Sequence, residues 1–201
     1  MHADTFKIYT NQKNNKFLSA YHGVKIFKSD LQGKCDSIAY SLSDSTIELH
    51  DEPILWSDSN QLTAIRIDLK MKNKQIHSIF LDQEAFIISE VDSVKYNQIK
   101  GKVMTGYFKN SKLSKIKVRG NGQTTYFGQD EDGKFIGVNV AVSSDLDITL
   151  KDNAINTISF INDPEATMYP MDELDPKTEL RYKGFKWLID LRPRRKADIY
   201  K

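Results

Sequence analysis

One short phrase, a polar turn followed by an alternating strand, recurs five times along this chain of 201 residues. The copies are YHGVKIF (21–27), LHDEPILW (49–56), LDQEAFI (81–87), NGQTTYF (121–127) and NDPEATMY (162–169). When they are aligned on the alternating pair after the turn, the pairs are Val24/Ile26, Ile54/Trp56, Ala85/Ile87, Thr124/Tyr126 and Ala166/Met168, at spacings of 30, 31, 39 and 42 residues. Such self-similarity is typical of stacked repeats, in which one unit cannot bury its apolar face alone. We therefore expect each copy to add a rung to the same pair of sheets.

Strand patterns fill the chain around these phrases. Period-2 runs rich in Ile, Val, Thr, Tyr and Phe include TFKIY, SIAYSL, AIRIDLKM, KVMTGYF and FIGVNVAV, and helical periodicity is nearly absent before residue 170. Short polar turns separate the runs, and the Asp-Gly of DEDGK (130–134) is the strongest short hairpin signal. The pattern predicts an all-β fold in residues 1–170. Residues 171–201 form a basic extension, with an acidic, proline-punctuated linker and then a short helix or strand.

Composition excludes several classes of protein. The formal net charge of +2 gives no overall argument for nucleic acid. Cys35 is the only cysteine, so no internal disulfide can form, and its strand context predicts a small core hydrophobe. No apolar run is long enough for a membrane-spanning helix. The start MHADTFKIY is strand-like and not a signal peptide, so we expect either a cytoplasmic chain or a trimmed form of an exported one.

The chain carries no recognisable catalytic motif. Nucleophile elbow, phosphate-binding loop, dinucleotide fingerprint and zinc-binding His-Glu pair are all missing, and no pair of carboxylates stands out for acid–base work. His22 and His50 occupy nearly equivalent turns, where stacked histidines could hold a metal. The third copy has Asp82 nearby and no histidine, which favours exposed turn histidines over a metal site. DEDG (130–133) lacks the rest of a calcium loop, which favours a solvated hairpin tip. We expect neither an enzyme nor a cofactor.

The extension invites a separate interpretation. Its last part holds eight basic residues, which are Arg181, Lys183, Lys186, Arg192, Arg194, Arg195, Lys196 and Lys201, against the acidic Asp190 and Asp198. Phe185 and Trp187 are interleaved with them, as in a stacking platform for nucleic acid. The simpler alternative is a solvated basic edge whose aromatic rings cap the end of the barrel. Among the functional alternatives, contact with lipid headgroup phosphates is favoured over nucleic acid, through Arg192, Arg194, Arg195 and Lys196.

The first half of the chain resembles a known family. The strand ADTFKIY, the turn HGVKIF and the next opening GKCDSIAY resemble the repeated pattern of the OstA-like, LptA-type β-jellyroll proteins of lipopolysaccharide transport. The resemblance covers about residues 2–90 well, residues 100–170 more loosely and the extension not at all, and it is greatest to the Bacteroidetes-type branch. Pro53 and Glu84 stand where the first copy has Gly23, so glycine is not required at that turn.

This resemblance implies a twisted, open-ended β-jellyroll in the periplasm, cut from a longer exported precursor. A slot between its two sheets would accept the acyl chains of lipopolysaccharide. Its edge strands would pair with other Lpt-type components or head to tail with further copies, forming a bridge to the outer membrane. Such a protein lies beside a membrane without spanning it, and it needs no catalytic group.

Alternation selects fourteen residues as candidates to line this slot, and Trp56 stands out among them by its size. They are Phe6, Ile8, Val24, Ile26, Ile38, Tyr40, Ile47, Leu49, Ile54, Trp56, Ile67, Leu69, Ala85 and Ile87. The same residues could simply form the core. In that case the chain would be a structural or adhesive β-repeat module with a tightly packed interior, binding protein or glycan through its outer face.

Overall fold

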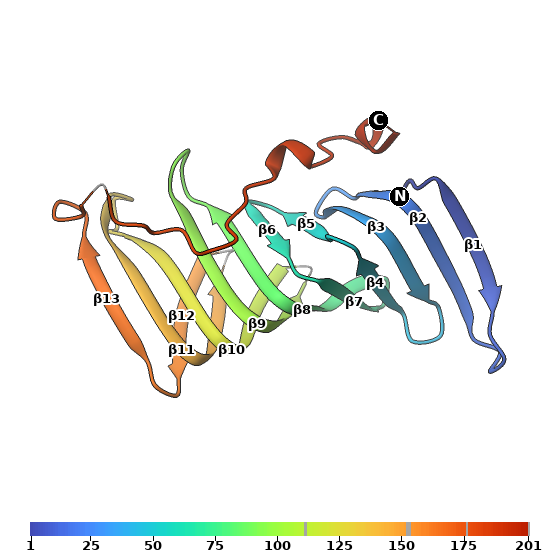
Figure 1. Cartoon of the computed structure of the whole chain (residues 1–201), viewed down its shortest axis with the longest axis horizontal. Helices are drawn as coiled ribbons and strands as arrows, with labels where there is room; N and C mark the ends of the chain where they lie inside the picture. Colours follow the sequence, from blue (N-terminus) through green and yellow to red (C-terminus); the bar gives the residue numbers. More distant parts are fainter. Residues whose placement is uncertain (111, 152–153, 176, 201) are drawn as a thin grey trace.

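A computed structural model describes residues 1–110, 112–151, 154–175 and 177–200 of the chain (Figure 1). The described residues form thirteen β-strands and two short 3-10 helices, with no α-helix among them, so the predicted all-β fold is confirmed. The strands are β1 (Thr5–Thr10), β2 (Lys16–Phe27), β3 (Gln32–Ser41), β4 (Thr46–His50), β5 (Ile54–Ser57), β6 (Asn60–Thr63), β7 (Arg66–Lys72), β8 (Gln75–Glu90), β9 (Tyr96–Lys109), β10 (Lys112–Gln129), β11 (Phe135–Lys151), β12 (Ala154–Ile161) and β13 (Glu165–Pro170). The helices are η1 (Ile189–Leu191) and η2 (Lys196–Tyr200).

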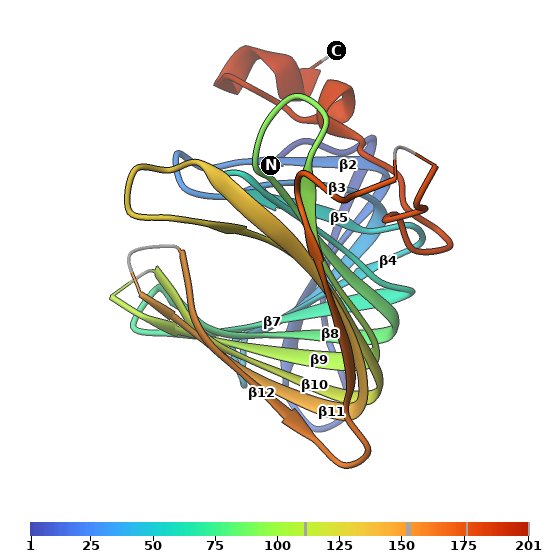
Figure 2. The same ribbon diagram turned by 90° about the vertical axis from the view of Figure 1, so that its left-hand side faces the viewer.

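All strands belong to one antiparallel sheet that is folded into two layers. The order β1-β2-β3-β4-β7-β8-β9-β10-β11-β12 runs through the first layer, which we call layer one. The strands β5, β6 and β13, together with the other halves of β2, β3 and β8 to β11, form layer two. The two layers meet along one edge and diverge toward the opposite edge, as Figure 2 shows from the β13 end. The open, twisted form matches the expected jellyroll.

The five recurring phrases lie at the corner where the chain crosses from one layer to the other. At each crossing one or two residues take a positive φ, and strand register shifts there in β2, β8 and β10. The corner residues are Gly23, Asp51, Glu52, Gln83, Glu84, Gly120, Asn121, Asn162 and Asp163. Asn and Asp tolerate this left-handed conformation better than most residues, and Glu52, Gln83 and Glu84 also adopt it, so glycine is not required at the corner. The repeat in the sequence is therefore the repeated corner of the fold.

One phrase was aligned one residue out of register. In the second copy the corner comprises Asp51 and Glu52, so Pro53 is the first residue after it and Leu55 takes the inward position. Leu55 pairs with Gly33 and Leu62, and it belongs to the core between the layers. Because neighbouring residues of a strand face opposite sides, Ile54 and Trp56 lie on the outer face of layer two. The prediction that these two line the slot is wrong.

The sheet ends at Pro170, and the chain continues along the outside of the molecule. Residues 171–200 run back over layer two from the β13 end to the β1 end (Figure 1). Near the chain's end the ring of Tyr200 packs edge-on against His2, at 5.3 Å between centroids. Pro176 and Lys201 of this extension lie outside the described residues. The division into a domain of 1–170 and an extension of 171–201 remains a prediction.

Candidate functional site

Two apolar rows cross the whole inner face of layer one. Residues that pair directly across antiparallel strands share a face, so the register defines each row. The first row is Phe6, Ala20, Ile38, Leu49, Ile67, Leu81, Met104, Val118, Leu146 and Phe160. The second row is Ile8, Leu18, Tyr40, Ile47, Leu69, Ile79, Gly106, Ile116, Ile148 and Ile158.

Layer two faces these rows with a third. It consists of Ile26, Gly33, Leu55, Leu62, Ile87, Ile99, Thr124, Ala141 and Ala166. We call the space between the three rows the interlayer seam. Thr124 and Tyr40 each contribute a hydroxyl group, and the other residues of the three rows have no side-chain oxygen or nitrogen. The seam therefore offers dispersion and hydrophobic contact and no reactive group.

The predicted lining residues differ in how accessible they are along this seam. Seven of them are fully buried in the shared core, and these are Val24, Ile38, Leu49, Ile67, Leu69, Ala85 and Ile87. Ile26, Tyr40 and Ile47 are half-buried. Phe6 and Ile8 lie on the edge strand β1 and are 49% and 74% exposed. The middle of the seam is therefore closed by the protein's own side chains, and its β1 end is open.

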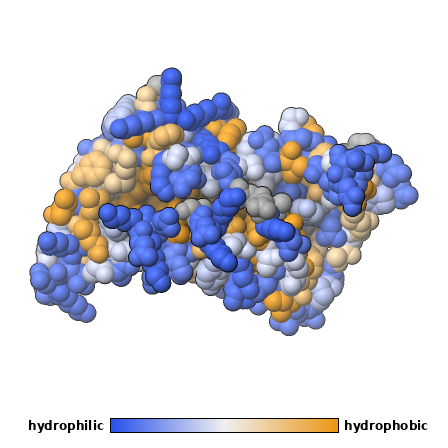
Figure 3. Space-filling model, turned by 180° about the vertical axis from the view of Figure 1, so that it is seen from behind, coloured by the Kyte–Doolittle hydropathy of each residue, from blue (hydrophilic) through white to orange (hydrophobic). Residues whose placement is uncertain are grey.

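The open side of the two layers keeps a border of half-buried apolar side chains. They pack against the core near the hairpin ends of layer one, and they include Ile47, Ile76, Phe108, Leu113, Leu150, Ile155 and Ile158. Figure 3 looks at this side, and apolar atoms gather at its left, which is the β1 end after the half-turn. Apolar surface thus follows the open side and is most exposed at the β1 end.

The isolated polar groups fit a non-reactive role. Burial raises the pKa of the Cys35 thiol to about 12, so the thiol stays protonated, in keeping with its prediction as a core hydrophobe. The exposed His22 bonds Asp36 at 2.7 Å, and this hydrogen bond raises its pKa. His50 lies 3.4 Å from Glu48. Within the described ranges no group of three potential ligands could hold a metal ion. The Asp130–Lys134 turn closes the β10–β11 hairpin, as DEDGK predicted.

The outer face of layer two carries a different row. It comprises Gln32, Trp56, Gln61, Ile88, Gln98 and Thr125, which pair in turn across β3, β5, β6, β8, β9 and β10. We call it the glutamine row. Its three glutamines are at most 4% exposed, although an outward strand position is normally solvated. Something must cover this face.

The cover is the segment 180–196, which we call the strap. Gln98 donates from Nε2 to the carbonyl of Leu180 at 2.8 Å and accepts the N–H of Tyr182 at 3.1 Å. Gln61 does the same with the carbonyl of Lys186 and the N–H of Leu188, both at 2.7 Å. Each side-chain amide therefore pairs with the strap's backbone as a neighbouring strand would.

The third glutamine binds a side chain of the strap. Arg192 donates from Nε to Gln32 Oε1 at 2.8 Å and from Nη1 to the carbonyl of Asp58 at 2.7 Å. Trp56 lies in the row between Gln32 and Gln61 and is fully buried, with its indole N–H unpartnered within the described structure. A tryptophan at this place lies on the strap side of layer two and does not face the seam.

Aromatic side chains complete the attachment. Tyr96 contacts the rings of Phe185 and Trp187 at 5.2 and 5.4 Å between centroids. Arg181 lies over Phe185 at 4.7 Å, and the hydroxyl of Tyr182 donates to the carbonyl of Thr124 at 2.8 Å. These rings pack on the outer face of layer two, so they neither cap the end of the sheet nor form a free stacking platform.

Sequence reasoning missed the strap, whose contacts with the sheet are regularly spaced. The strap touches the three glutamines through Leu180-Arg-Tyr182, Lys186-Trp-Leu188 and Arg192, at intervals of six residues. The glutamines lie two strands apart, or about 9.5 Å. Six extended residues span about 20 Å, so the strap must turn between contacts. It does so at Tyr182–Phe185 and Leu188–Leu191.

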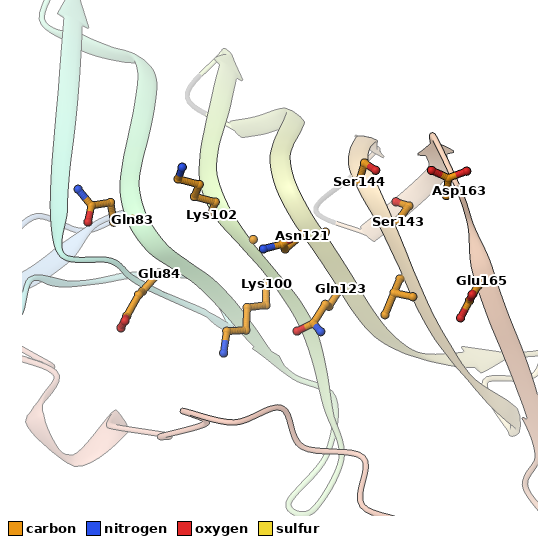
Figure 4. Close-up of a pocket in the computed structure, with 13 residues that line it drawn as sticks. Gln83, Glu84, Lys100, Lys102, Asn121, Gln123, Ser143, Ser144, Asp163 and Glu165 are labelled. Carbon is orange, nitrogen blue, oxygen red and sulfur yellow. The ribbon is translucent and has the colours of Figure 1, made fainter.

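A hollow of about 800 Å³ lies outside the corner and is shown in Figure 4. Its side chains are mostly polar and carry both signs of charge, and they include Glu84, Lys100, Lys102, Asp163 and Glu165. Such a surface suits water better than acyl chains. The interlayer seam therefore remains the candidate site.

Comparison with known proteins agrees with this geometry. Residues 1–75 match the family described as the LptA/(LptD N-terminal domain) LPS transport protein. No curated protein matches the chain in sequence. The crystal structure of LptH, described as the LptA homologous periplasmic component of the lipopolysaccharide transport device from Pseudomonas aeruginosa, superposes with a TM-score of 0.52 at 11% identity, covering 70% of this chain and 95% of LptH. The likeness to LptH shows a shared fold, and together with the match over residues 1–75 it confirms the resemblance of this chain to the LptA-type family.

Proposed function

We propose that the protein is a non-enzymatic, periplasmic component of lipopolysaccharide transport that holds the lipid's acyl chains against the interlayer seam. The observation that carries the proposal is the pair of apolar rows that runs unbroken from β1 to β12 and emerges into solvent at Phe6 and Ile8. Each buried CH₂ group contributes about 0.8 kcal/mol, so several acyl chains need no charged partner inside the seam. The family match and the LptH-like fold support this function.

The closed middle of the seam sets how a lipid enters. Acyl chains would first contact the half-buried border and the exposed β1 end, and then part the layers by displacing core side chains. On this route the lipid contacts the exposed lining residues first and the fully buried lining residues afterwards. No step in it requires a cofactor or an energy source within this chain.

The ends of the sheet are suited to assembly. β1 pairs only with β2, β12 only with β11, and β13 only with β11, so each leaves one strand edge without a ladder partner within the described chain. Unpaired edges accept another strand through main-chain hydrogen bonds. Pairing β1 of one copy with the far edge of another copy, or of another transport component, would join their seams into a bridge.

A displacement assay tests lipid binding. The intact chain is loaded with a fluorescent fatty acid and titrated with lipopolysaccharide and, separately, with lipid A. We expect saturable displacement by both. Tryptophan emission is a poor report for this purpose, because Trp56 and Trp187, the only tryptophans, lie on the strap side of layer two.

Ile8→Asp places a charge at the exposed β1 end of the seam without opening the core. We expect it to weaken lipid A binding by roughly tenfold, since a desolvated carboxylate opposes an acyl chain. Val94→Asp is the matched control, because Val94 is 66% exposed in the β8–β9 connection and belongs to none of the three rows. Equal affinities for the two variants, or no displacement by a folded sample, would favour the structural or adhesive module.

A further inference from the structure

The basic side chains of the strap are held away from the interlayer seam. The strap lies on the outer face of layer two, whereas the seam lies against the inner face (Figure 2). The backbone and aromatic rings of the strap point at the sheet through the glutamine row and Tyr96. Its cations therefore cannot neutralise the phosphates of a lipid whose acyl chains sit in the middle of the seam.

These cations form a dense and exposed group. Residues 181–196 contain seven basic residues and one acidic residue, Asp190. Six of the basic side chains are exposed and, within the described part of the chain, make no hydrogen bond to the sheet through their charged groups. Arg181 lies over the rings of Phe185 and Tyr96, and among the other five only Arg195 has an ion pair there, with Asp198 at 3.3 Å. The five are Lys183, Lys186, Arg194, Arg195 and Lys196.

The sheet beneath adds positive charge at the β1 end, with Asp58 in the β5–β6 turn as a nearby carboxylate. Lys25 and Lys34 are direct partners across β2 and β3, and like charges in that position repel each other. A hollow of about 410 Å³ opens between them and the strap. Its charged lining comprises Lys25, Lys34, Arg192 and Arg194, together with Asp190 and Asp198. The positive excess at this hollow suits a phosphate group.

An apolar side chain projects from the same surface. Leu191 in η1 is 45% exposed and stands next to Arg192. Cations with a neighbouring exposed hydrophobe are the usual composition of a surface that rests on lipid headgroups, where the cations meet phosphates and the hydrophobe enters the acyl boundary. The acidic linker residues Asp172, Glu173 and Asp175 precede the strap in the sequence, so they are separated from the basic run of residues 181–196.

We propose that the strap docks the protein on an anionic bilayer surface, through Lys183, Lys186, Arg194, Arg195, Lys196 and the exposed Leu191. Docking in this position leaves the seam and its exposed β1 end free, because they are on the other side of layer two. The inference does not rest on the proposed transport function. A bilayer held by the strap interacts through headgroup charge, whereas lipid bound in the seam interacts through acyl chains.

Vesicle flotation with the full chain tests this docking. The protein is mixed with vesicles of phosphatidylglycerol in phosphatidylcholine and, in parallel, with vesicles of pure phosphatidylcholine. We expect flotation with the anionic vesicles alone, and loss of that flotation as salt shortens the screening length. Salt-resistant flotation with both kinds of vesicle would show capture by the seam and would overturn the proposal.

A matched pair of variants separates the position of the charge from its amount. Changing the five docking cations of the strap to Gln should weaken binding to anionic vesicles by at least roughly a hundredfold. The control changes five exposed lysines elsewhere to Gln, and these are Lys13, Lys70, Lys72, Lys74 and Lys109. Both variants have the same net charge, so equal weakening would mean non-specific attraction and would overturn the proposal.

Leu191→Asp gives a second readout that leaves the five cations in place. We expect it to weaken flotation by roughly tenfold, because a carboxylate at the acyl boundary opposes insertion. Circular dichroism of each variant checks that the sheet remains folded. Unchanged flotation of Leu191→Asp, together with unchanged flotation of the five-residue strap variant, would leave no role for this surface. Binding of the fluorescent fatty acid should be unaffected in all three variants.

Discussion

The two outer faces of the folded sheet use opposite chemistry. The outside of layer one is wet and charged, with cross-strand ion pairs such as Arg66–Asp82 at 3.2 Å and Arg119–Asp147 at 2.8 Å. The outside of layer two carries the uncharged glutamine row and is covered by the strap. Both faces alternate with the same apolar interior, so alternation alone does not say whether an outward face meets water or chain. Cross-strand ion pairs mark the outside of layer one, and a row of buried amides marks the part of layer two that the strap covers.

Among the variants that test this difference between the two faces, Gln61→Leu is expected to lower the free energy of unfolding the most. The variant leaves the carbonyl of Lys186 and the N–H of Leu188 without their partner beneath the strap. Two buried backbone groups that lose their hydrogen bonds cost about 2–4 kcal/mol in the free energy of unfolding. Urea denaturation measures this loss, and limited proteolysis should show earlier cleavage within residues 180–196.

Gln123→Leu is the control on the same sheet. Gln123 is half-buried on β10 and makes no hydrogen bond to the strap. The same change there should shift the unfolding free energy by less than about 0.5 kcal/mol. If Gln61→Leu were as mild as Gln123→Leu, the strap would not be held by its amide contacts, and the distinction between the two outer faces would lose its energetic basis.

Arg119→Ala probes the bare face, where a smaller effect is expected. Arg119 donates to Asp147 at 2.8 Å and to the carbonyls of Val118 and Leu146. Its side chain is 40% exposed, so water screens the ion pair and the loss should be about 1 kcal/mol. The loss should shrink between about 0.05 M and about 0.5 M salt.

The comparison variant for this face is Lys117→Ala. Lys117 lies on the same strand with no ion pair of its own within the described chain. It should unfold like the parent at both salt concentrations. A loss for Arg119→Ala above about 3 kcal/mol, or one that salt does not change, would mean that the bare face is held as tightly as the covered one.

Local sequence patterns predicted most of the fold, because each layer consists of alternating strands joined by polar turns. Alternation and polar turns located the strands, and the repeated phrase located the corner. The register of the second copy was missed because the sequence pattern did not show that Pro53, and not Ile54, is the first residue after the crossing. A shift of one residue there moved Ile54 and Trp56 to the wrong face. Periodicity fixes which residues share a face, but it does not fix which face is inside.

The strap could not be predicted from the same patterns, because it depends on contacts between distant parts of the chain. Gln61 and Leu188 are 127 residues apart, and Gln32 and Arg192 are 160 apart. A glutamine in a strand normally indicates a solvated position, so nothing local identified the row as covered. The basic residues of the extension were identified in the sequence. The face of the molecule on which they lie is set by the packing of the strap over the glutamine row, which local patterns do not show.

The smallest effect concerns two aspartates on the bare face whose pKa values shift in opposite directions. Burial raises the pKa of Asp147, but hydrogen bonds from Lys115 and Arg119 outweigh it and hold the pKa below its ordinary value. Its stabilisation is therefore complete above the unfolded pKa of about 4 and is lost as the pH falls through the folded value. Burial raises the pKa of Asp68 in spite of Arg66, so the folded state takes up this proton first and gains stability relative to the unfolded state as the pH falls.

Carboxyl NMR titration should show Asp147 titrating below Asp68, and Asp147→Asn should flatten the acid limb of the unfolding free energy while Asp68→Asn steepens it. If the two carboxyls titrate together, then neither the hydrogen bonds to Asp147 nor the burial of Asp68 shifts a pKa, and charge serves that face through solubility and not through stability.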